Sequence, residues 1–408
     1  MAVDAPWSDT ALWLNARLLA LGGMWRPPWC PARCYLLYRA WVFFTLFSFF
    51  VAQIQALWHF WGDMDKITHD VCLMISIILS ITKFFIFNFK EREVFRLVRR
   101  IDDTRAEQIE TGDSEITSIL DASYRSARGV ALMMTCLGGS IPGVWAVIPI
   151  LMRRLGIFPP ERELPGTSWY TGRDGETPIY ETLYVLQYFS MQNSFFTAVG
   201  PDLLFVAFII HAAGQLEVLN ARLRRVGGAS DARKLQKARE EEEESGEAGC
   251  GELAWRELCG CIRHHQHVIG LIKEIERMVS KIVLLQFLGA TVIICVTLYQ
   301  SSKHTENMAA LLMLQGYLGL IMYEVFMYCW YAEDILYQNS RLAVSAYSSG
   351  WVGAVPQLQR ALVFVICRTQ RPLGLTAGKF YYVSRESFVS LMSASYSYYA
   401  LLRQVNDK

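Results

Sequence analysis

The densest group of metal-ligating residue types in the chain comprises Cys259, Cys261, His264, His265 and His267. Cysteine and histidine are the usual ligands of zinc, so this group is the first candidate for a metal centre. A Cys-x-Cys spacing is too close for an ordinary zinc knuckle, however, and no second ligand pair follows. The chain also holds only 7 histidines, too few for the several histidine clusters of a membrane di-iron enzyme. We therefore predict no metal and no cofactor.

Other patterns that support catalysis are also missing from the sequence. No glycine-rich phosphate loop, no Ser/His/Asp set and no paired-carboxylate site stands out. The acidic run Glu240–Glu244 has no apolar period, which is typical of a solvated insertion. The formal net charge of +1 gives no overall field that would attract nucleic acid. We expect neither an enzyme nor a nucleic-acid-binding protein.

A regular row of mostly polar side chains runs along the last apolar segment of the chain. The row consists of Ser390, Ser393, Ser397, Leu401 and Gln404. At 100° per residue these positions form a strip about 80° wide on a helix. One interpretation is small-residue packing against another membrane helix. The other is the wall of a water-lined pore, narrowed by Leu401 as a hydrophobic constriction. The spacing leaves both open, and a pore would require about four copies of this helix around an axis.

We also make predictions for three residues close to this row. Glu386 lies near the same strip at the start of the segment, where its carboxylate either attracts cations or complements the dipole of the helix N-terminus. Tyr396 and Tyr399 lie off the strip and are expected to point toward neighbouring helices.

The elements that must position these residues are membrane-spanning helices. The chain is 53% hydrophobic and only 19% charged, which is apolar for a water-soluble protein. A helical span needs about 20 apolar residues. Seven stretches qualify or come close: Trp41–Trp61, Val71–Phe89, Gly129–Met152, Thr182–Gly214, Ile282–Ser302, Asn307–Ala332 and Ser387–Leu402. We therefore predict an all-α membrane protein with seven transmembrane helices, and expect kinks at Pro142 and Pro149.

Lysine and arginine set the predicted orientation. Of the 39 basic residues, 29 fall on the side of the N-terminus and 8 on the other side. Because basic loops stay inside, the N-terminus is predicted to be cytoplasmic and the C-terminus extracellular. A G-protein-coupled receptor has the reverse orientation. Asp202 and Glu324 are acids within spans, and we expect interfacial exposure or a structural hydrogen bond for each. With no paired intramembrane charges expected, a transporter is disfavoured.

The same features divide the chain into four regions. Residues 1–35 form a cytoplasmic N-terminal segment, and residues 36–332 form a six-span bundle with a long cytoplasmic loop at 215–281. Residues 333–378 are predicted to form a cytoplasmic anchor or assembly region that contains a short helix, Val352–Cys367. Residues 379–408 form the seventh helix and an extracellular tail.

Motifs near the C-terminus resemble those of insect odorant receptors. They are Ala346-Tyr347-Ser348-Ser349-x-Trp351 with Pro356, Arg368-x-Gln370-x-Pro372-Leu373, Thr376-Ala377-Gly378-x-Phe380, Phe388, Ser395-Tyr396-Ser397-Tyr398 and Leu401-Leu402-Arg403-Gln404. Motif-level resemblance covers about the last sixty residues, whereas hydropathy resembles the family throughout. Ala332-Glu333 departs from the family's usual Gly followed by an acidic residue. The closing residues differ from those of gustatory relatives and of the shared co-receptor, which favours a ligand-tuning subunit.

The resemblance implies an odorant-gated, nonselective cation channel, assembled as a heterotetramer with the co-receptor in the plasma membrane of olfactory neuron dendrites. It places the gate at Leu401 with Gln404 beyond it, and the pocket for a small volatile odorant in the outer halves of spans two, three, four and six. The residues predicted there are Met74, Ile77, Ile78, Ser140, Gly143, Trp145, Val147, Tyr188, Met191, Phe195, Met313, Leu314 and Tyr317. A G-protein-coupled chemoreceptor and a gustatory-type ligand-gated channel are the alternative functions.

Overall fold

The computed structural model describes residues 12–62, 64–154, 164–166, 168–170, 174–227, 249–303 and 308–406, and these are almost entirely helical. The acidic run Glu240–Glu244 lies outside the described residues. In chain order the elements are α1 (Trp13–Leu21), α2 (Ala32–His59), α3 (Met64–Phe89), α4 (Glu91–Ile109), α5 (Ser114–Arg154), α6 (Ile179–Arg225), α8 (Gly249–Lys303), α9 (Met308–Tyr347), α10 (Pro356–Thr369), β1 (Thr376–Ala377), β2 (Tyr381–Tyr382) and α11 (Arg385–Asn406).

Among the described residues, six helices are long and apolar enough to cross a membrane: α2, α3, α5, α6, α8 and α9. Each coincides with one of the first six predicted spans, although the first and sixth predictions extend past the helix ends, to Trp61 and Asn307. The seventh predicted span is the helix α11, whose Ser and Tyr side chains keep its hydropathy low. Pro142 and Pro149 both lie inside α5, which continues through them as one helix.

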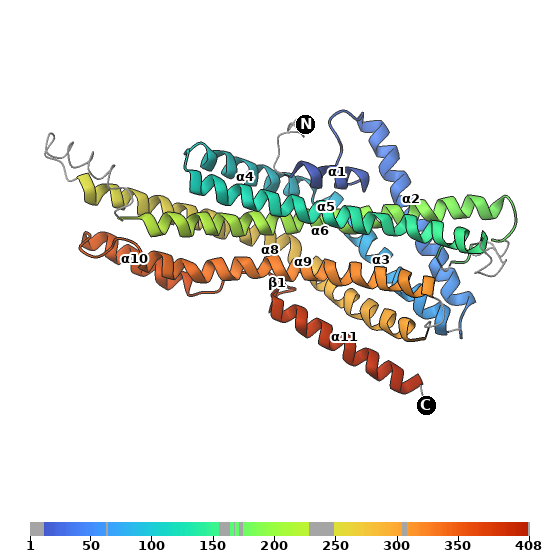
Figure 1. Ribbon diagram of the computed structural model, residues 1–408. Coiled ribbons are helices and arrows are strands. Elements are labelled where there is room, and N and C mark those ends of the chain that lie inside the picture. The colour runs from blue at the N-terminus through green and yellow to red at the C-terminus, as the bar shows by residue number, and fades with distance from the viewer. Residues whose placement is uncertain are drawn as a thin grey trace.

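Several of these helices are much longer than a bilayer is thick. Helix α8 has 55 residues and α6 has 47, whereas about 20 residues cross the hydrocarbon core. At 1.5 Å per residue, α8 extends over about 80 Å. The molecule is accordingly elongated, with α10 and the start of α8 at the end that the charge distribution predicts to be cytoplasmic (Figure 1).

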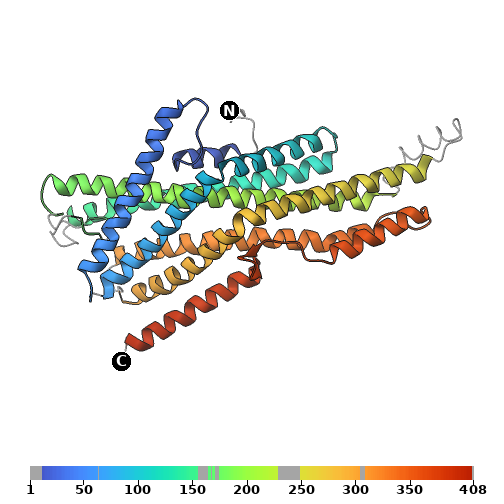
Figure 2. The same cartoon turned by 180° about the vertical axis from the view of Figure 1, so that it is seen from behind.

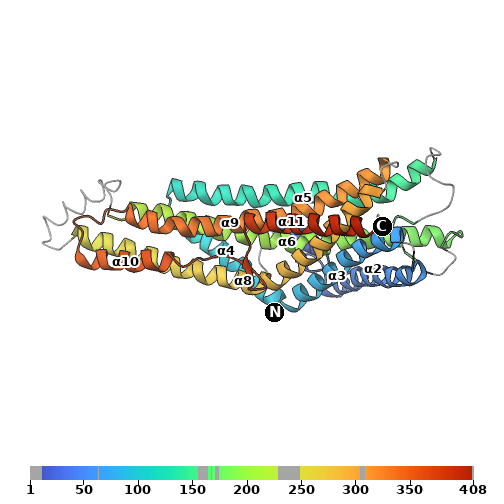
Figure 3. The same cartoon turned by 90° about the horizontal axis from the view of Figure 1, so that it is seen from below.

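Helix α6 forms the centre of the bundle. It packs against α1, α2, α3, α5, α8 and α9, with α5 on one side and α2 and α3 on the other (Figure 3). Almost every side chain from Val199 to Leu216 is buried, since this stretch is apolar on all sides. Gly214 allows α5 to come close, because a Cβ there would lie 2.3 Å from the Oγ of Ser123.

Helix α11 leaves the bundle and packs on α8 and α9 alone among the described helices, as the view from behind shows (Figure 2). The β1–β2 hairpin holds its start against α8. Gly378 in this hairpin has a φ of 59° and donates its backbone N–H to the carbonyl of Ser280 at 3.0 Å. A Cβ at Gly378 would lie 2.4 Å from Leu284, so glycine is needed both for the turn and for the close approach.

The short helix expected over Val352–Cys367 is α10, which begins later, at Pro356. Proline is favoured in the first turn because its missing N–H has no helical partner there. Before it, Gly353 adopts a φ of 78°, which breaks the helical conformation.

Candidate functional site

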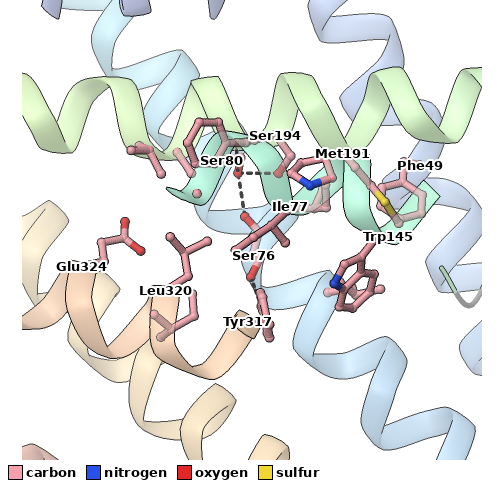
Figure 4. A pocket seen from close by; sticks show the side chains of 18 residues that line it. Phe49, Ser76, Ile77, Ser80, Trp145, Met191, Ser194, Tyr317, Leu320 and Glu324 are labelled. Carbon is pink, nitrogen blue, oxygen red and sulfur yellow. Dashed lines mark hydrogen bonds between the residues drawn. The ribbon is translucent and has the colours of Figure 1, made fainter. Parts of the chain in front are cut away.

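A cavity of about 120 Å³ lies inside the bundle, between five helices. Its wall is made by α2, α3, α5, α6 and α9, and Figure 4 shows the side chains around it. The lining residues are Phe49, Leu73, Ser76, Ile77, Ser80, Gly138, Ile141, Pro142, Trp145, Met191, Ser194, Phe195, Ala198, Val199, Tyr317, Leu320, Ile321 and Glu324.

Each helix contributes one stripe of its surface to this wall. On α9, Tyr317, Leu320, Ile321 and Glu324 follow the i, i+3, i+4, i+7 pattern of a single helical face. The four lining residues of α3 follow the same spacing. The wall therefore results from regular helices packed side by side and needs no irregular loop.

The hydroxyl groups in the wall bind one another. The Oγ of Ser76 lies 2.6 Å from the Oη of Tyr317, and the Oγ of Ser80 lies 2.9 Å from the Oγ of Ser194 (Figure 4). Ser80 also donates to the carbonyl of Ser76 at 2.8 Å. Paired hydroxyls cost little to bury. Apart from these hydroxyls and Glu324, the side chains that line the cavity are largely apolar.

Glycine and aromatic residues fix the shape of the cavity. A Cβ at Gly138 would lie 2.6 Å from Phe195 and 2.8 Å from Leu320, so α5 can approach α6 and α9 only with glycine here. The rings of Trp145 and Tyr317 lie 6.2 Å apart, within the range of a favourable aromatic pair. Pro142 has no N–H for the carbonyl of Gly138, which leaves that carbonyl without its helical donor.

Gly166, in the described part of the connection between α5 and α6, lies beside a residue of the cavity wall. Gln187 on α6 accepts a hydrogen bond from the N–H of Gly166 at 3.2 Å and donates one to its carbonyl at 3.0 Å. Gly166 in turn lies against the end of Met191, because a Cβ there would be 2.7 Å from Cε of that methionine. One glutamine side chain thus holds this connection beside a lining residue.

A buried ion cluster lies at one end of the cavity, and it corrects the expectation that the acids within the spans have no charged partner. The Nζ of Lys83 on α3 lies 2.5 Å from Oδ2 of Asp202 on α6 and 3.3 Å from Oε1 of Glu324 on α9. Tyr328 donates to Oδ1 of Asp202 at 2.9 Å. The two acids are buried and hydrogen-bonded, so the alternative of interfacial exposure was wrong. The prediction failed because the partner lies on a different span.

Five of the thirteen residues predicted for the pocket line this cavity: Ile77, Trp145, Met191, Phe195 and Tyr317. The other eight do not line it: Met74, Ile78, Ser140, Gly143, Val147, Tyr188, Met313 and Leu314. Ile78, Ser140 and Val147 are exposed on the outside of the bundle. On α5, α6 and α9 the cavity lies about one helical turn closer to the predicted cytoplasmic side than the predicted set.

The sequence did not predict Phe49, the lining residue of α2, or most of the polar residues of the cavity wall. Ser76, Ser80 and Ser194 are hydroxyls within apolar spans, which is a usable signal. Leu320, Ile321 and Glu324 follow from Tyr317 by helical periodicity. Phe49 had no signal, since nothing in the sequence distinguishes it from the other phenylalanines of α2.

The polar strip of α11 faces away from its own subunit. Ser390, Ser393, Ser397, Leu401 and Gln404 are all exposed, and Leu401 is 59% exposed. The face that packs on the bundle carries Leu391 and Ser395, which are both buried and lie roughly opposite the strip at 100° per residue. Tyr396, expected to point toward a neighbouring helix, is exposed in the single subunit, and its ring centre lies 5.9 Å from that of Tyr399. Glu386 is exposed in the first turn.

The cysteine and histidine group on α8 has other partners. His264 lies 3.0 Å from Oε1 of Gln215 and 3.1 Å from Nε2 of Gln108. His267 lies within hydrogen-bond distance of Arg100 and Thr104. No group of three or more metal-ligating side chains is present in the part of the chain that the structure describes.

Comparisons with known proteins agree on one family. The family model described as "7tm Odorant receptor" matches residues 63–396. Odorant receptor Or2 of Anopheles gambiae is 26% identical over 364 residues, covering 87% of this chain and 89% of that protein. Odorant receptor 2a of Drosophila melanogaster is 25% identical over 408 residues, covering 97% and 96%.

The fold matches a solved member of the same group. The insect olfactory receptor OR5 from Machilis hrabei, in complex with eugenol, superposes with a TM-score of 0.78 at 16% identity, over 98% of this chain and all of that one. This match confirms the predicted fold class, with α11 as its seventh span, and speaks against a G-protein-coupled receptor. The chain belongs to the seven-transmembrane odorant receptor family.

Proposed function

We propose that this chain is the odorant-binding subunit of a heteromeric, odorant-gated, nonselective cation channel in the plasma membrane of insect olfactory neuron dendrites. The observation that carries the proposal is the cavity between α2, α3, α5, α6 and α9. Its volume of about 120 Å³ is close to that of an engineered apolar cavity of roughly 150 Å³ that binds benzene. A small volatile molecule has the size and the apolar character to fill it.

Contacts between α9 and α11 support a route from ligand to gate. Glu324 lines the cavity, and two residues later Phe326 packs on Phe388 of α11, with 5.6 Å between ring centres. Cys329 lies 3.7 Å from the Oγ of Ser387. A ligand that binds the open arrangement more tightly shifts the population toward it. In this mechanism, movement of α9 displaces α11 and with it Leu401, which obstructs the pore as a hydrophobic constriction.

The outward-facing strip of α11 supports assembly with other subunits. A single helix encloses no pore, so the hydroxyls at Ser390, Ser393 and Ser397 line one only when about four such helices surround an axis. We propose a heterotetramer with the odorant receptor co-receptor, in which this chain supplies ligand recognition and one part of the pore wall. Permeant cations then pass Gln404 and Leu401 at the predicted outer end.

The test is a recording of ligand-evoked currents from cells that express this chain with and without the co-receptor. We expect currents to a subset of a broad panel of volatile molecules only when both chains are present. Reversal near 0 mV with sodium and potassium on opposite sides would show a nonselective cation pore. A heteromer at the cell surface that responds to no volatile, or a response abolished by blocking G proteins, would contradict the proposal.

A pair of leucines on α9 ties the response to the cavity. Leu320 lines the cavity, whereas Leu312 on the same helix is exposed on the outside of the bundle. Removing ligand contacts by Leu320→Ala costs about 1–2 kcal/mol of binding, a decrease of roughly 5- to 30-fold in potency. Leu312→Ala is expected to leave the dose–response curve unchanged. Equal effects of the two substitutions would place the ligand elsewhere.

A further inference from the structure

The ion cluster beside the cavity contains two acids for one base. Lys83 donates to Asp202, to Glu324 and to the carbonyl of Ala198. Asp202 holds the shorter contact with the ammonium, at 2.5 Å, and also accepts the hydroxyl of Tyr328. Glu324 holds the longer contact, at 3.3 Å. Glu324 also has a hydrogen-bond contact with Asp202, so the two acids and the ammonium form one connected cluster.

Of these three ions, Glu324 is the one that lines the cavity. Its side chain is buried, at 3% exposure, so bulk water does not serve it as it would a surface carboxylate. An acceptor in such a place gains more from a new donor than one in water, because the local dielectric constant is low. A donor group on a molecule in the cavity is therefore well placed to bind the carboxyl group of Glu324.

The polarity of the cavity wall changes from one end to the other. In Figure 4, Glu324 lies at one side, Phe49 and Trp145 lie at the other, and Ser76 lies between them. Along α9, Tyr317 and Glu324 are seven residues apart, about 10 Å at 1.5 Å per residue. The intervening hydroxyls are already paired with each other. A ligand thus finds an aromatic region at one end and the carboxyl group of Glu324 at the other.

We propose that Glu324 selects odorants with a hydrogen-bond donor, an O–H or N–H group, at one end of a compact apolar body. This inference rests on the proposed function and names the ligand class of that cavity. The apolar body packs against Trp145 and Phe49, and the donor group binds the Glu324 carboxylate. A ligand of the same shape without the donor leaves that carboxylate with its partners in the cluster, Lys83 and Asp202. Sites built to bind a polar group discriminate strongly against analogues that lack it.

The experiment compares matched pairs of ligands on the heteromer of this chain and the co-receptor. Each pair has one body with a terminal O–H or a terminal methyl group, such as benzyl alcohol and ethylbenzene, and the series covers bodies of increasing size. The quantity scored is the ratio of half-maximal concentrations within the most potent pair. We expect the donor ligand to be at least about tenfold more potent in the wild type, because hydrogen bonds to charged groups are strong.

Glu324→Gln removes the charge with little change in shape and is expected to reduce this ratio to within about threefold of unity. Asp202→Asn is the matched control, since it removes one charge from the same cluster but is not in the cavity wall. It is expected to keep the wild-type ratio even where it lowers all responses. If Glu324 had a purely structural role, Glu324→Gln would lower the potency of both ligands equally and leave the ratio unchanged. Glu324→Asp, which retains the charge but withdraws it by one methylene, serves where Glu324→Gln does not reach the surface.

The outcomes separate the two proposals. A wild-type heteromer that responds to ethylbenzene and benzyl alcohol with equal potency, or a ratio that survives both Glu324 substitutions, would overturn the role of Glu324 while leaving the receptor function intact. A heteromer at the cell surface that is silent to every pair and to the broad volatile panel would instead remove the proposed function itself.

Discussion

Gly138 illustrates how a single residue sets the dimensions of the cavity. A Cβ added there would lie within 3 Å of Phe195 of α6 and Leu320 of α9, and both of these side chains line the cavity. A methyl group at this position must displace one of the two, and both displacements change the space left for a ligand.

We expect Gly138→Ala to narrow the range of active ligands by excluding the larger ones. Overpacking of this kind typically costs about 1–3 kcal/mol, so potency for a ligand that fills the cavity should fall roughly tenfold or more. Gly143→Ala on the same helix is the control, because a Cβ there has nothing within 4 Å. Dose–response curves for a homologous ligand series measure the change in potency for each substitution. An identical change for the two variants would contradict this role of Gly138.

At this scale the sequence predicted residue types better than contacts. Helical periodicity indicates which residues share a stripe with Tyr317, but it does not show which stripes of five helices face one another. The surroundings of Glu324 were predicted from its position along its own span alone, because its partner Lys83 lies 241 positions away in the sequence. Such a pairing follows from tertiary packing and has no local signal.

Helix α11 is the element whose role depends most on its surroundings. Its apolar face packs on α8 and α9, its start is held by the β1–β2 hairpin, and its polar strip is left outside the subunit. The angular spacing of Ser390, Ser393 and Ser397 was enough to predict the strip. It was not enough to choose between packing and pore lining, since both uses favour small hydroxyl side chains.

The position of Leu401 on the strip yields a prediction for this element. Leu401→Ala shortens the hydrophobic side chain at the narrow point, so the closed state should dewet less readily and basal current should rise. Leu402→Ala is the control, because Leu402 lies 100° around the helix from Leu401 and therefore off the polar strip. Single-channel recording of the heteromer measures open probability without ligand, and unchanged basal and odorant-evoked currents would exclude Leu401 as the gate.

At the scale of the whole molecule, large apolar side chains remain exposed on α10 and on the β1–β2 hairpin. On α10 the side chain of Phe364 is 76% exposed beside Val363, and Phe380 of the hairpin is 79% exposed. Apolar patches of this kind mark interaction sites. They lie in or directly after the region predicted to assemble subunits, residues 333–378, which remains a prediction.

Phe364→Asp places a charge in this surface and is expected to reduce assembly with the co-receptor. Burying an unpaired carboxylate in an interface costs several kcal/mol, so the fraction of co-receptor that co-purifies with a tagged chain should fall at least about tenfold. Gln357→Asp, on the same exposed side of α10, serves as the control. Equal recovery of the co-receptor with both variants would exclude this part of α10 from the interface.

The overall architecture was the most predictable level. Length and hydropathy located the first six spans, and the charge distribution gave an orientation for the N-terminus. They did not indicate that α8 would continue as one helix of 55 residues. Charged residues outside a membrane leave no hydropathy signal, although α8 packs against α3, α6, α9 and α11 along its length.

The exposed polar strip of α11 has a consequence for inheritance and diversity. Much of the chemistry around the ion path of a mixed assembly would be encoded by another gene, whereas the cavity is built entirely from this one. Substitutions in the cavity wall can therefore accumulate and retune ligand preference without altering conductance. A receptor repertoire could diversify in what it detects while every member keeps the same electrical output.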